Sequence, residues 1–145
     1  MISAVLDTNV LVSGLIGADK PSSTPGELIR RWRDGSYQLV VSEHLLGELA
    51  VTLTDPWFAS RLSAETIAET LDTLQADAVM QAVTVSVSGV ASHPEDDVVI
   101  ATALSARSLY LVTGDKQLLV RTAYRGTSFI TPRQFLEVLD SESRR

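Results

Sequence analysis

Short apolar runs alternate with helical patterns along the whole chain, and this alternation constrains the fold more than any other feature. The run from Ile2 to Leu6 stops at Asp7, and the run from Leu109 to Val112 stops at Thr113-Gly114-Asp115. Short apolar runs bounded by turn residues are typical of buried strands. Strands that alternate with helices favour a mostly parallel sheet with helices on both faces.

The expected fold is α/β, a three-layer α/β/α sandwich with a mostly parallel central sheet of four to five strands. The expected strands are Ile2–Leu6, Tyr37–Val41, Val83–Val87, Leu109–Val112 and Phe129–Ile130. Helices are expected to begin after the caps Thr24, Ser42, Ser63 and Thr131, and over Asp97–Arg107. Pro25 and Glu27 complete a capping-box pattern with Thr24, and Gln134 does so with Thr131. The length predicts one domain over residues 1–140 and a short frayed tail over 141–145.

The composition limits the classes of function. The chain has 145 residues and no cysteine, so neither disulfides nor thiolate metal sites are available. Its net charge of −6 argues against nucleic-acid binding driven by overall charge, because phosphate binding rests on Lys and Arg. No basic segment precedes an apolar one at the N-terminus, and no uncharged apolar run approaches the roughly 20 residues of a membrane span. We therefore expect a cytoplasmic protein.

Four acidic residues fall where a parallel sheet would form a ligand site, outside the carboxyl ends of its strands. Asp7 follows a strand directly, and Asp115 follows another after Thr113-Gly114. Asp97 begins a helix after a loop, and Glu48 lies in the helix that follows Tyr37–Val41. Each has an ordinary structural explanation when taken alone. Asp7 could be a turn residue or helix cap, Asp97 could favour the helix dipole, and Glu48 could lie on a solvated face.

Taken together, the four acids indicate a metal site. Like charges at one rim repel one another unless a cation neutralises them, and oxygen ligands without Cys favour Mg²⁺ or Mn²⁺. His44 and His93 do not form a metal-binding pair. The glycine-rich motifs that bind nucleotides are absent, as is the G-x-S-x-G elbow of serine hydrolases.

Beyond the positions of single acids, the sequence resembles PIN-domain nucleases. The resemblance is carried by the segments 5–14 (VLDTNVLVSG), 42–49 (SEHLLGEL), 93–103 (HPEDDVVIATA) and 111–119 (LVTGDKQLL), with 130–136 (ITPRQFL) similar to one branch. The segments occur in order over nearly the whole chain. The resemblance implies a PIN-like fold and a Mg²⁺- or Mn²⁺-dependent endoribonuclease of the VapC-like toxin branch. It also implies an RNA substrate, a small antitoxin protein as partner, and a homodimer.

Carried over by position, the resemblance gives Asp7, Glu48, Asp97 and Asp115 as catalytic residues and metal ligands. Asp97 is preferred to its neighbour Asp96, because the family's acid is followed by two residues and then Ile/Leu-Ala, here Val98-Val99 and then Ile100-Ala101. We expect Asp7 and Asp115 to be direct ligands and Glu48 to act through water. Asn9 and Thr113 match supporting polar positions, and Asp96 is also expected to support the site. Toxin-type members of the family often have basic residues around the active site. The candidates here are Arg30, Arg31, Arg33, Lys116, Arg121, Arg125 and Arg133, although the first three share a helix and cannot all face one way.

Three other interpretations remain to be weighed. A PIN-like module without activity could act through protein binding, although all four acids are present. A haloacid-dehalogenase-like phosphatase needs a second Asp at the position of Asn9. A receiver domain needs its paired acids early in the chain, whereas the Asp96-Asp97 pair comes late.

Overall fold

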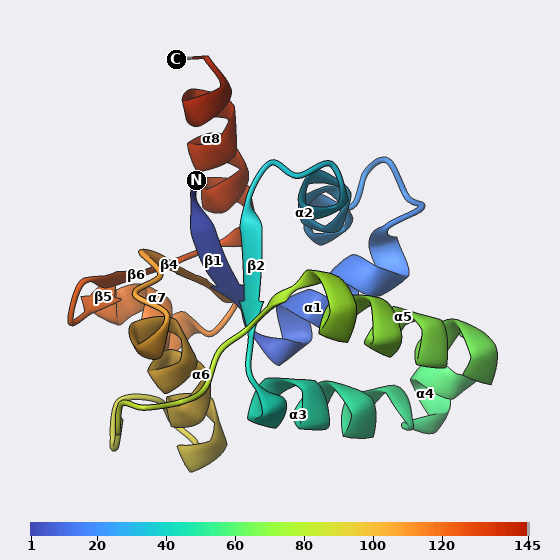
Figure 1. The fold of residues 1–145 in the computed structure, drawn as a ribbon, viewed down its shortest axis with the longest axis horizontal. Helices are drawn as coiled ribbons and strands as arrows, with labels where there is room; N and C mark the ends of the chain where they lie inside the picture. Colours follow the sequence, from blue (N-terminus) through green and yellow to red (C-terminus); the bar gives the residue numbers. More distant parts are fainter. Residues whose placement is uncertain (145) are drawn as a thin grey trace.

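A six-stranded sheet forms the centre of residues 1–144, the part of the chain that the computed structural model describes (Figure 1). The strands are β1 (Ser3–Leu6), β2 (Gln38–Val41), β3 (Val79–Met80), β4 (Tyr110–Val112), β5 (Ala123–Tyr124) and β6 (Thr127–Ile130). Their order is β3-β2-β1-β4-β6-β5, and every neighbouring pair is parallel except β5 with β6. The predicted α/β fold is confirmed, and the short edge strands β3 and β5 take the sheet beyond the expected four to five strands.

Helices cover both faces of this sheet. They are α1 (Thr8–Gly17), α2 (Thr24–Arg33), α3 (Glu43–Leu53), α4 (Pro56–Ala59), α5 (Ala64–Asp77), α6 (Pro94–Ser105), α7 (Lys116–Arg121) and α8 (Pro132–Ser143). Successive residues of a strand point to opposite faces. Leu111 of β4 lines a pocket together with Val99 of α6, whereas the ring of Tyr110 lies 5.7 Å from that of Phe135 in α8. The sheet therefore lies between α6 and α8, as the three-layer prediction requires.

The central strand β1 is buried on both sides. Ala4, Val5 and Leu6 are fully buried, which is typical of a parallel strand covered by helices on both faces. Its neighbours are β2 on one side and β4 on the other, so the strand order reverses between β1 and β4. Residues that follow these two strands emerge side by side at the switch point, because Leu6 pairs with Val112.

Helices α1 and α2 touch through their backbones. A Cβ atom on Gly26 would lie 2.1 Å from the carbonyl oxygen of Gly17, and one on Gly17 would lie 2.1 Å from Ser23 Oγ. No side chain fits in such a space, so glycine is required at both positions. The contact fixes α1, whose N-terminus lies at the switch point directly after β1.

The predicted strand Val83–Val87 is wrong. This segment is irregular, and the short strand β3 occupies the edge of the sheet instead. The alternation of valines was misleading because the segment leaves the sheet and runs against α6. The backbone N–H groups of Thr84 and Val85 donate to Ser105 Oγ at 2.9 and 3.2 Å rather than to a neighbouring strand.

Other boundaries also differ from the sequence prediction. Residues 8–17 and 116–121 are helical, although the sequence analysis predicted no helix there. The N-cap of α2 is Ser23 rather than Thr24, and the capping box is present only at α8. Helix α8 continues through Ser143, so most of the predicted tail is helical, while residue 145 lies outside the described residues. Between residues 1 and 144, every helix is too short or too polar to cross a membrane.

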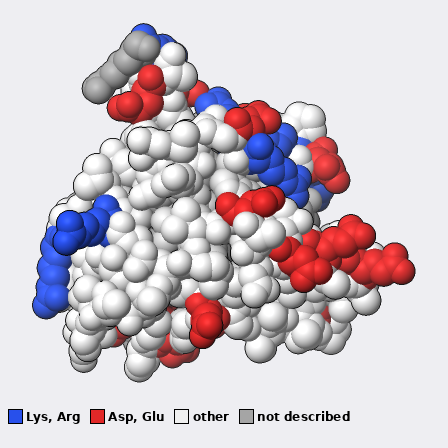
Figure 2. All heavy atoms as spheres, in the orientation of Figure 1, with Lys and Arg blue, Asp and Glu red and all other residues white. Residues whose placement is uncertain are grey.

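Charged side chains are distributed unevenly over the surface (Figure 2). On the face shown, acidic side chains gather where Figure 1 draws α5, which carries Glu65, Glu69 and Asp72. A group of Lys and Arg atoms lies at the opposite edge, where Figure 1 draws α7 and β5. The net negative charge therefore does not describe every part of the surface.

Candidate active site

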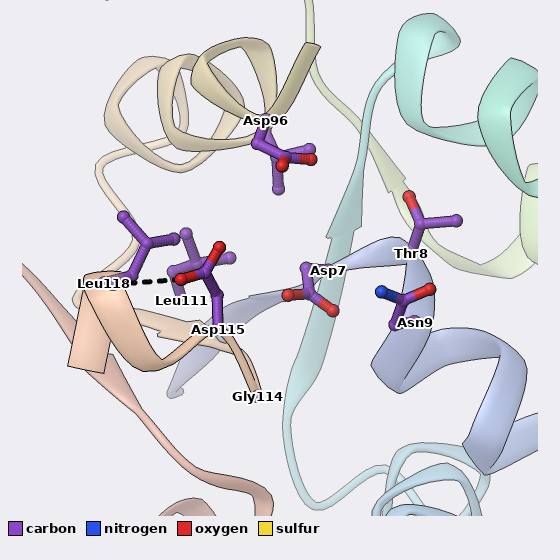
Figure 3. A pocket seen from close by; sticks show the side chains of 9 residues that line it. Asp7, Thr8, Asn9, Asp96, Leu111, Gly114, Asp115 and Leu118 are labelled. Atoms are coloured by element: carbon purple, nitrogen blue, oxygen red, sulfur yellow. Dashed lines mark hydrogen bonds between the residues drawn. The ribbon is translucent and has the colours of Figure 1, made fainter. Parts of the chain in front are cut away.

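Three carboxylates face one pocket at the switch point of the sheet. Asp7 follows β1, Asp115 follows β4, and Asp96 projects from α6 on the opposite side of the pocket (Figure 3). The remaining lining residues are Thr8, Asn9, Val99, Leu111, Gly114 and Leu118. The structure thus brings Asp7, Asn9, Asp96 and Asp115 of the predicted set to one cavity.

A buried threonine joins the two strand-end acids. The hydroxyl of Thr113 donates a hydrogen bond to Asp7 Oδ2 and accepts one from the backbone N–H of Asp115 at 3.0 Å. Thr113 is fully buried, so this hydroxyl has a fixed environment. The predicted supporting role of Thr113 has a geometric basis: it sets the positions of Asp7 and Asp115 relative to one another.

Both strand-end acids are also helix N-caps. Asp7 Oδ1 accepts the backbone N–H of Val10 at 3.0 Å, and Asp115 Oδ1 accepts those of Gln117 and Leu118 at 2.8 and 3.3 Å. Capping and ligand binding are compatible here, because a carboxylate offers about four lone-pair sites. Within residues 1–144, Asp115 Oδ2 has no hydrogen-bond partner and remains available to a ligand.

The local environment disfavours negative charge on two of the acids. Burial is the main cause that raises the pKa of Asp7 above its usual value; the charge of Asp115 adds to it, while the hydrogen bond from Thr113 opposes it. Burial also raises the pKa of Asp96, with further contributions from the charges of Glu48 and Asp7. A bound cation would reverse both effects.

The preference for Asp97 over Asp96 is not supported by the geometry. Helix α6 begins at Pro94, earlier than expected, and adjacent residues of a helix point about 100° apart. Asp97 is 5% exposed, and its carboxylate accepts the backbone N–H groups of Gly89, Val90 and Ala91 at 3.0, 3.1 and 2.7 Å. Asp97 therefore holds the preceding loop against α6, and Asp96 is the acid at the pocket.

Glu48 lies in an adjoining hollow rather than in the pocket itself. This hollow shares Thr8, Asn9 and Asp96 with the pocket. Glu48 Oε2 accepts a hydrogen bond from Thr8 Oγ1 at 3.0 Å, and Glu48 Oε1 lies 2.9 Å from His44 Nε2. Sequence reasoning missed the part played by Thr8, although its place between Asp7 and Asn9 was a usable signal. The mid-helix position of Glu48 explains why it reaches the rim only indirectly.

Comparison with known proteins assigns the family. The sequence model of the PIN domain matches residues 3–117, which is most of the chain. This chain belongs to the PIN domain family. The matched region contains β1, β2, β4 and every acid discussed above.

A structural comparison agrees with this assignment at the level of the fold. The PIN domain described here is similar to a chain in the crystal structure of VapBC2 from Rickettsia felis bound to a DNA fragment from their promoter. The TM-score is 0.55 at 14% identity, and the match covers 90% of this chain and 98% of that chain. No protein with curated annotation matches the sequence.

The pocket of this PIN domain offers the kind of ligand atom that a hard divalent cation prefers, but its side chains alone do not complete a coordination shell. All the polar side chains of the pocket offer oxygen, together with the amide of Asn9, and such ligands favour Mg²⁺ or Mn²⁺. Within residues 1–144, no three His, Cys, Asp or Glu side chains are grouped closely enough to hold a metal ion together. Mg²⁺ commonly keeps several waters and takes only one or two carboxylates from a protein, so the arrangement fits that mode.

Proposed function

We propose that this PIN domain is a metal-dependent endoribonuclease that hydrolyses RNA phosphodiester bonds. The observation that carries the proposal is the meeting of Asp7, Asp96 and Asp115 at one pocket of a chain that belongs to the PIN domain family. Three carboxylates without a basic side chain among the pocket residues are costly unless a cation is present, and a cation is also what a polyanionic substrate needs.

In this proposal Asp7 and Asp115 hold the cation, and Thr113 fixes their relative positions. A bound Mg²⁺ or Mn²⁺ would polarise the phosphate and lower the pKa of a water molecule. Asp96 faces the pair across the pocket and has no side-chain hydrogen bond within residues 1–144. In the proposed mechanism its carboxylate would accept a hydrogen bond, and then a proton, from the attacking water. Thr8 and His44 hold Glu48 beside this centre, where it orients water.

The biological role that we propose is that of a VapC-like toxin in a type II toxin–antitoxin system, acting on RNA in the cytoplasm. The fold likeness to a chain from a VapBC2 complex supports a small antitoxin protein as partner. We also propose that the chain forms a homodimer. Co-purification with the product of an adjacent short gene would test the antitoxin, and light scattering would test the dimer.

A catalytically inactive module is the second candidate, since the described residues contain no group of three acids that could hold a metal together. The two functions are separated by incubating purified protein with single-stranded RNA in Mg²⁺, in Mn²⁺ and in EDTA. The proposed nuclease cleaves in the metal buffers and not in EDTA. Equal cleavage in EDTA would show that the metal mechanism is wrong, and no cleavage in any buffer would favour the binding module.

The same assay tests the assignment of Asp96. We expect Asp96→Asn to lose cleavage while it remains folded, and Asp97→Asn to retain cleavage for each folded molecule. Circular dichroism measures the folded fraction of each variant. If Asp97→Asn loses cleavage while fully folded and Asp96→Asn does not, the positions of the two acids in the mechanism are reversed.

A further inference from the structure

One segment of the chain contains several basic residues and no acidic residue. Residues 116–136 hold four of the twelve Lys and Arg residues and none of the eighteen Asp and Glu residues. Because the whole chain has a net charge of −6, this segment differs sharply from its surroundings. It begins at Lys116, the residue directly after the pocket acid Asp115.

Several other basic residues are already paired within the protein. Arg30 and Arg31 both contact Glu27, and Arg31 also contacts Asp140 at 2.9 Å. Arg133, in the acid-free segment, donates a hydrogen bond to Thr24 at 3.3 Å. In contrast, Lys116, Arg121 and Arg125 are exposed and form no ion pair within residues 1–144.

One tyrosine holds two of these unpaired cations near each other. The guanidinium carbons of Arg121 and Arg125 lie 5.2 and 5.1 Å from the centre of the Tyr124 ring, which packs against the hydrophobic core. Cation–π contacts of this kind restrict the arginines without neutralising them. Two like charges held around one ring repel each other, and an anion that binds both would relieve that repulsion.

The turn that carries Arg125 is itself unusual. Arg125 and Gly126 form the two-residue connection between β5 and β6, with φ of +47° and +91°. Such hairpin turns favour Asn or Asp followed by Gly, because both positions need positive φ. An arginine at the first position is strained, and strained residues of this kind cluster at functional sites. The turn thus keeps a cation where the backbone would prefer a small polar residue.

Helix α7 connects the pocket to these cations. Asp115 caps the N-terminus of α7 and Arg121 is the last residue of this helix. The helix has six residues and is therefore about 9 Å long. Figure 2 shows the basic atoms at this edge with no acidic atoms beside them on the face drawn. A strand whose scissile phosphate lay in the pocket would place neighbouring phosphates within reach of α7 and the turn.

We propose that Lys116, together with Arg121 and Arg125 on the ring of Tyr124, binds the phosphodiester backbone of a single nucleic-acid strand beside the pocket. We call these four residues the α7–β5 basic patch. The inference rests on the proposed function only for the direction of the strand, toward the pocket. The shared chemistry is a chain of phosphates, which single-stranded RNA and single-stranded DNA both offer.

The test measures binding without cleavage. Fluorescence anisotropy in EDTA reports the affinity of the protein for labelled single-stranded oligouridylate RNA and for oligothymidylate DNA of the same length, at several salt concentrations. Arg121→Gln and Arg125→Asn are each expected to weaken binding several-fold, and the double variant more. Each neutralised phosphate contact contributes about 0.7 to the slope of log affinity against log salt for single strands, so each variant should reduce the slope by about that amount.

The Arg125→Asn variant distinguishes a loss of RNA binding from a loss of folded protein. Asn is favoured at this turn position, so the variant should unfold at a higher temperature than the unaltered protein while it binds RNA more weakly. The matched control is Arg61→Gln, since Arg61 also stacks on an aromatic ring, at 3.6 Å from the centre of Trp57. Arg61 directly follows the region of α4, which Figure 1 draws on the side opposite β5. This control should bind both oligonucleotides as the unaltered protein does.

The outcomes separate this inference from the proposed nuclease. Unchanged affinity and salt slope in the Arg121→Gln/Arg125→Asn double variant would overturn the patch, even if RNA is cleaved in Mg²⁺. Binding that depends on the patch would support it even if no RNA is cleaved. Similar losses for RNA and DNA support contact with the backbone, whereas an equal loss in Arg61→Gln contradicts a localised patch.

Discussion

The rim acids and the charge cluster on α2 show two opposite ways to place carboxylates in one small domain. Glu27 contacts Arg30 at 2.7 Å and Arg31 at 3.0 Å, and these hydrogen bonds lower its pKa below the usual value. Asp7 and Asp96 have raised pKa values, because burial and neighbouring carboxylates disfavour their charge. In the α2 cluster the carboxylate of Glu27 is paired with arginines, whereas Asp7, Asp96 and Asp115, the rim acids, form no ion pair within residues 1–144. The contrast locates the part of the molecule that a cation would stabilise.

The largest expected effect comes from neutralising a rim acid that we propose as a metal ligand. Asp7→Asn should reduce metal-dependent RNA cleavage by more than about 100-fold, since removal of even supporting groups around a metal costs that much. Asn caps helices as well as Asp does, so α1 should stay folded. Initial cleavage rates in Mg²⁺ and circular dichroism measure the two effects. Glu27→Gln is the matched control, and a near-normal rate in Asp7→Asn would remove the rim from the mechanism.

A second prediction separates the adjacent acids of α6 by stability. Asp97→Asn should lower the free energy of unfolding by about 1–3 kcal/mol. The amide oxygen of Asn can still accept the N–H groups of Val90 and Ala91, but its NH₂ group then faces the N–H of Gly89, and two donors cannot form a hydrogen bond. For a chain of this length, each kcal/mol corresponds to about 2–4 °C in melting temperature. Urea denaturation of Asp97→Asn beside Asp96→Asn measures the difference. A stability equal to that of the unaltered protein would show that the loop does not depend on this carboxylate.

A third prediction concerns how the stability of the protein depends on pH through Asp96. The folded-state pKa of Asp96 is raised above its ordinary value of 3.8, so the folded protein holds this proton more tightly than the unfolded chain does. Without metal, the protein therefore loses stability as the pH rises from below 3.8 through the raised pKa. Asp96→Asn does not titrate and should therefore be the more stable protein at neutral pH. Its advantage should disappear as pH falls toward 3.8. Denaturation in EDTA across this range tests the sign, and a variant less stable than the unaltered protein at neutral pH would contradict it.

The smallest effect is expected in the α2 cluster, with the opposite sign. Glu27→Gln should lose less than about 1 kcal/mol at neutral pH, because partly exposed ion pairs are weak. The folded-state pKa of Glu27 is lowered, so its stabilising contribution is present above pH 4.5 and is lost as pH falls through that lowered pKa. The loss should also shrink in high salt. A destabilisation that persists at low pH and in high salt would indicate a packing role instead.

The acids at strand ends were predictable from the sequence, while the acid on α6 was not. Asp7 and Asp115 follow apolar runs, and topology alone brings such positions together. The choice between Asp96 and Asp97 depends on where α6 begins and on which loop atoms need a partner, and neither is visible in a local pattern. The family pattern favoured Asp97, yet in the structure three backbone N–H groups occupy its carboxylate.

The elements that sequence reasoning missed lack a clear periodic pattern. Helix α1 carries Val10, Leu11 and Val12 in succession, all buried, so no single apolar stripe marks it as a helix. The hairpin of β5 and β6 turns at Arg125-Gly126, whereas the sequence signal typical of such a turn is Asn-Gly. In both regions tertiary contacts override the local preference of the chain.

The glycine contact between α1 and α2 limits how this domain can change over evolutionary time. Because Gly17 and Gly26 admit no side chain, a larger residue at either position would separate α2 from α1, the helix that Asp7 caps. Gly114 lies at the mouth of the pocket and Gly47 at the edge of the adjoining hollow, and a Cβ atom on either would meet nothing within 4 Å. New substrate preferences can therefore arise by adding side chains around the opening, while the support beneath the acids stays unchanged.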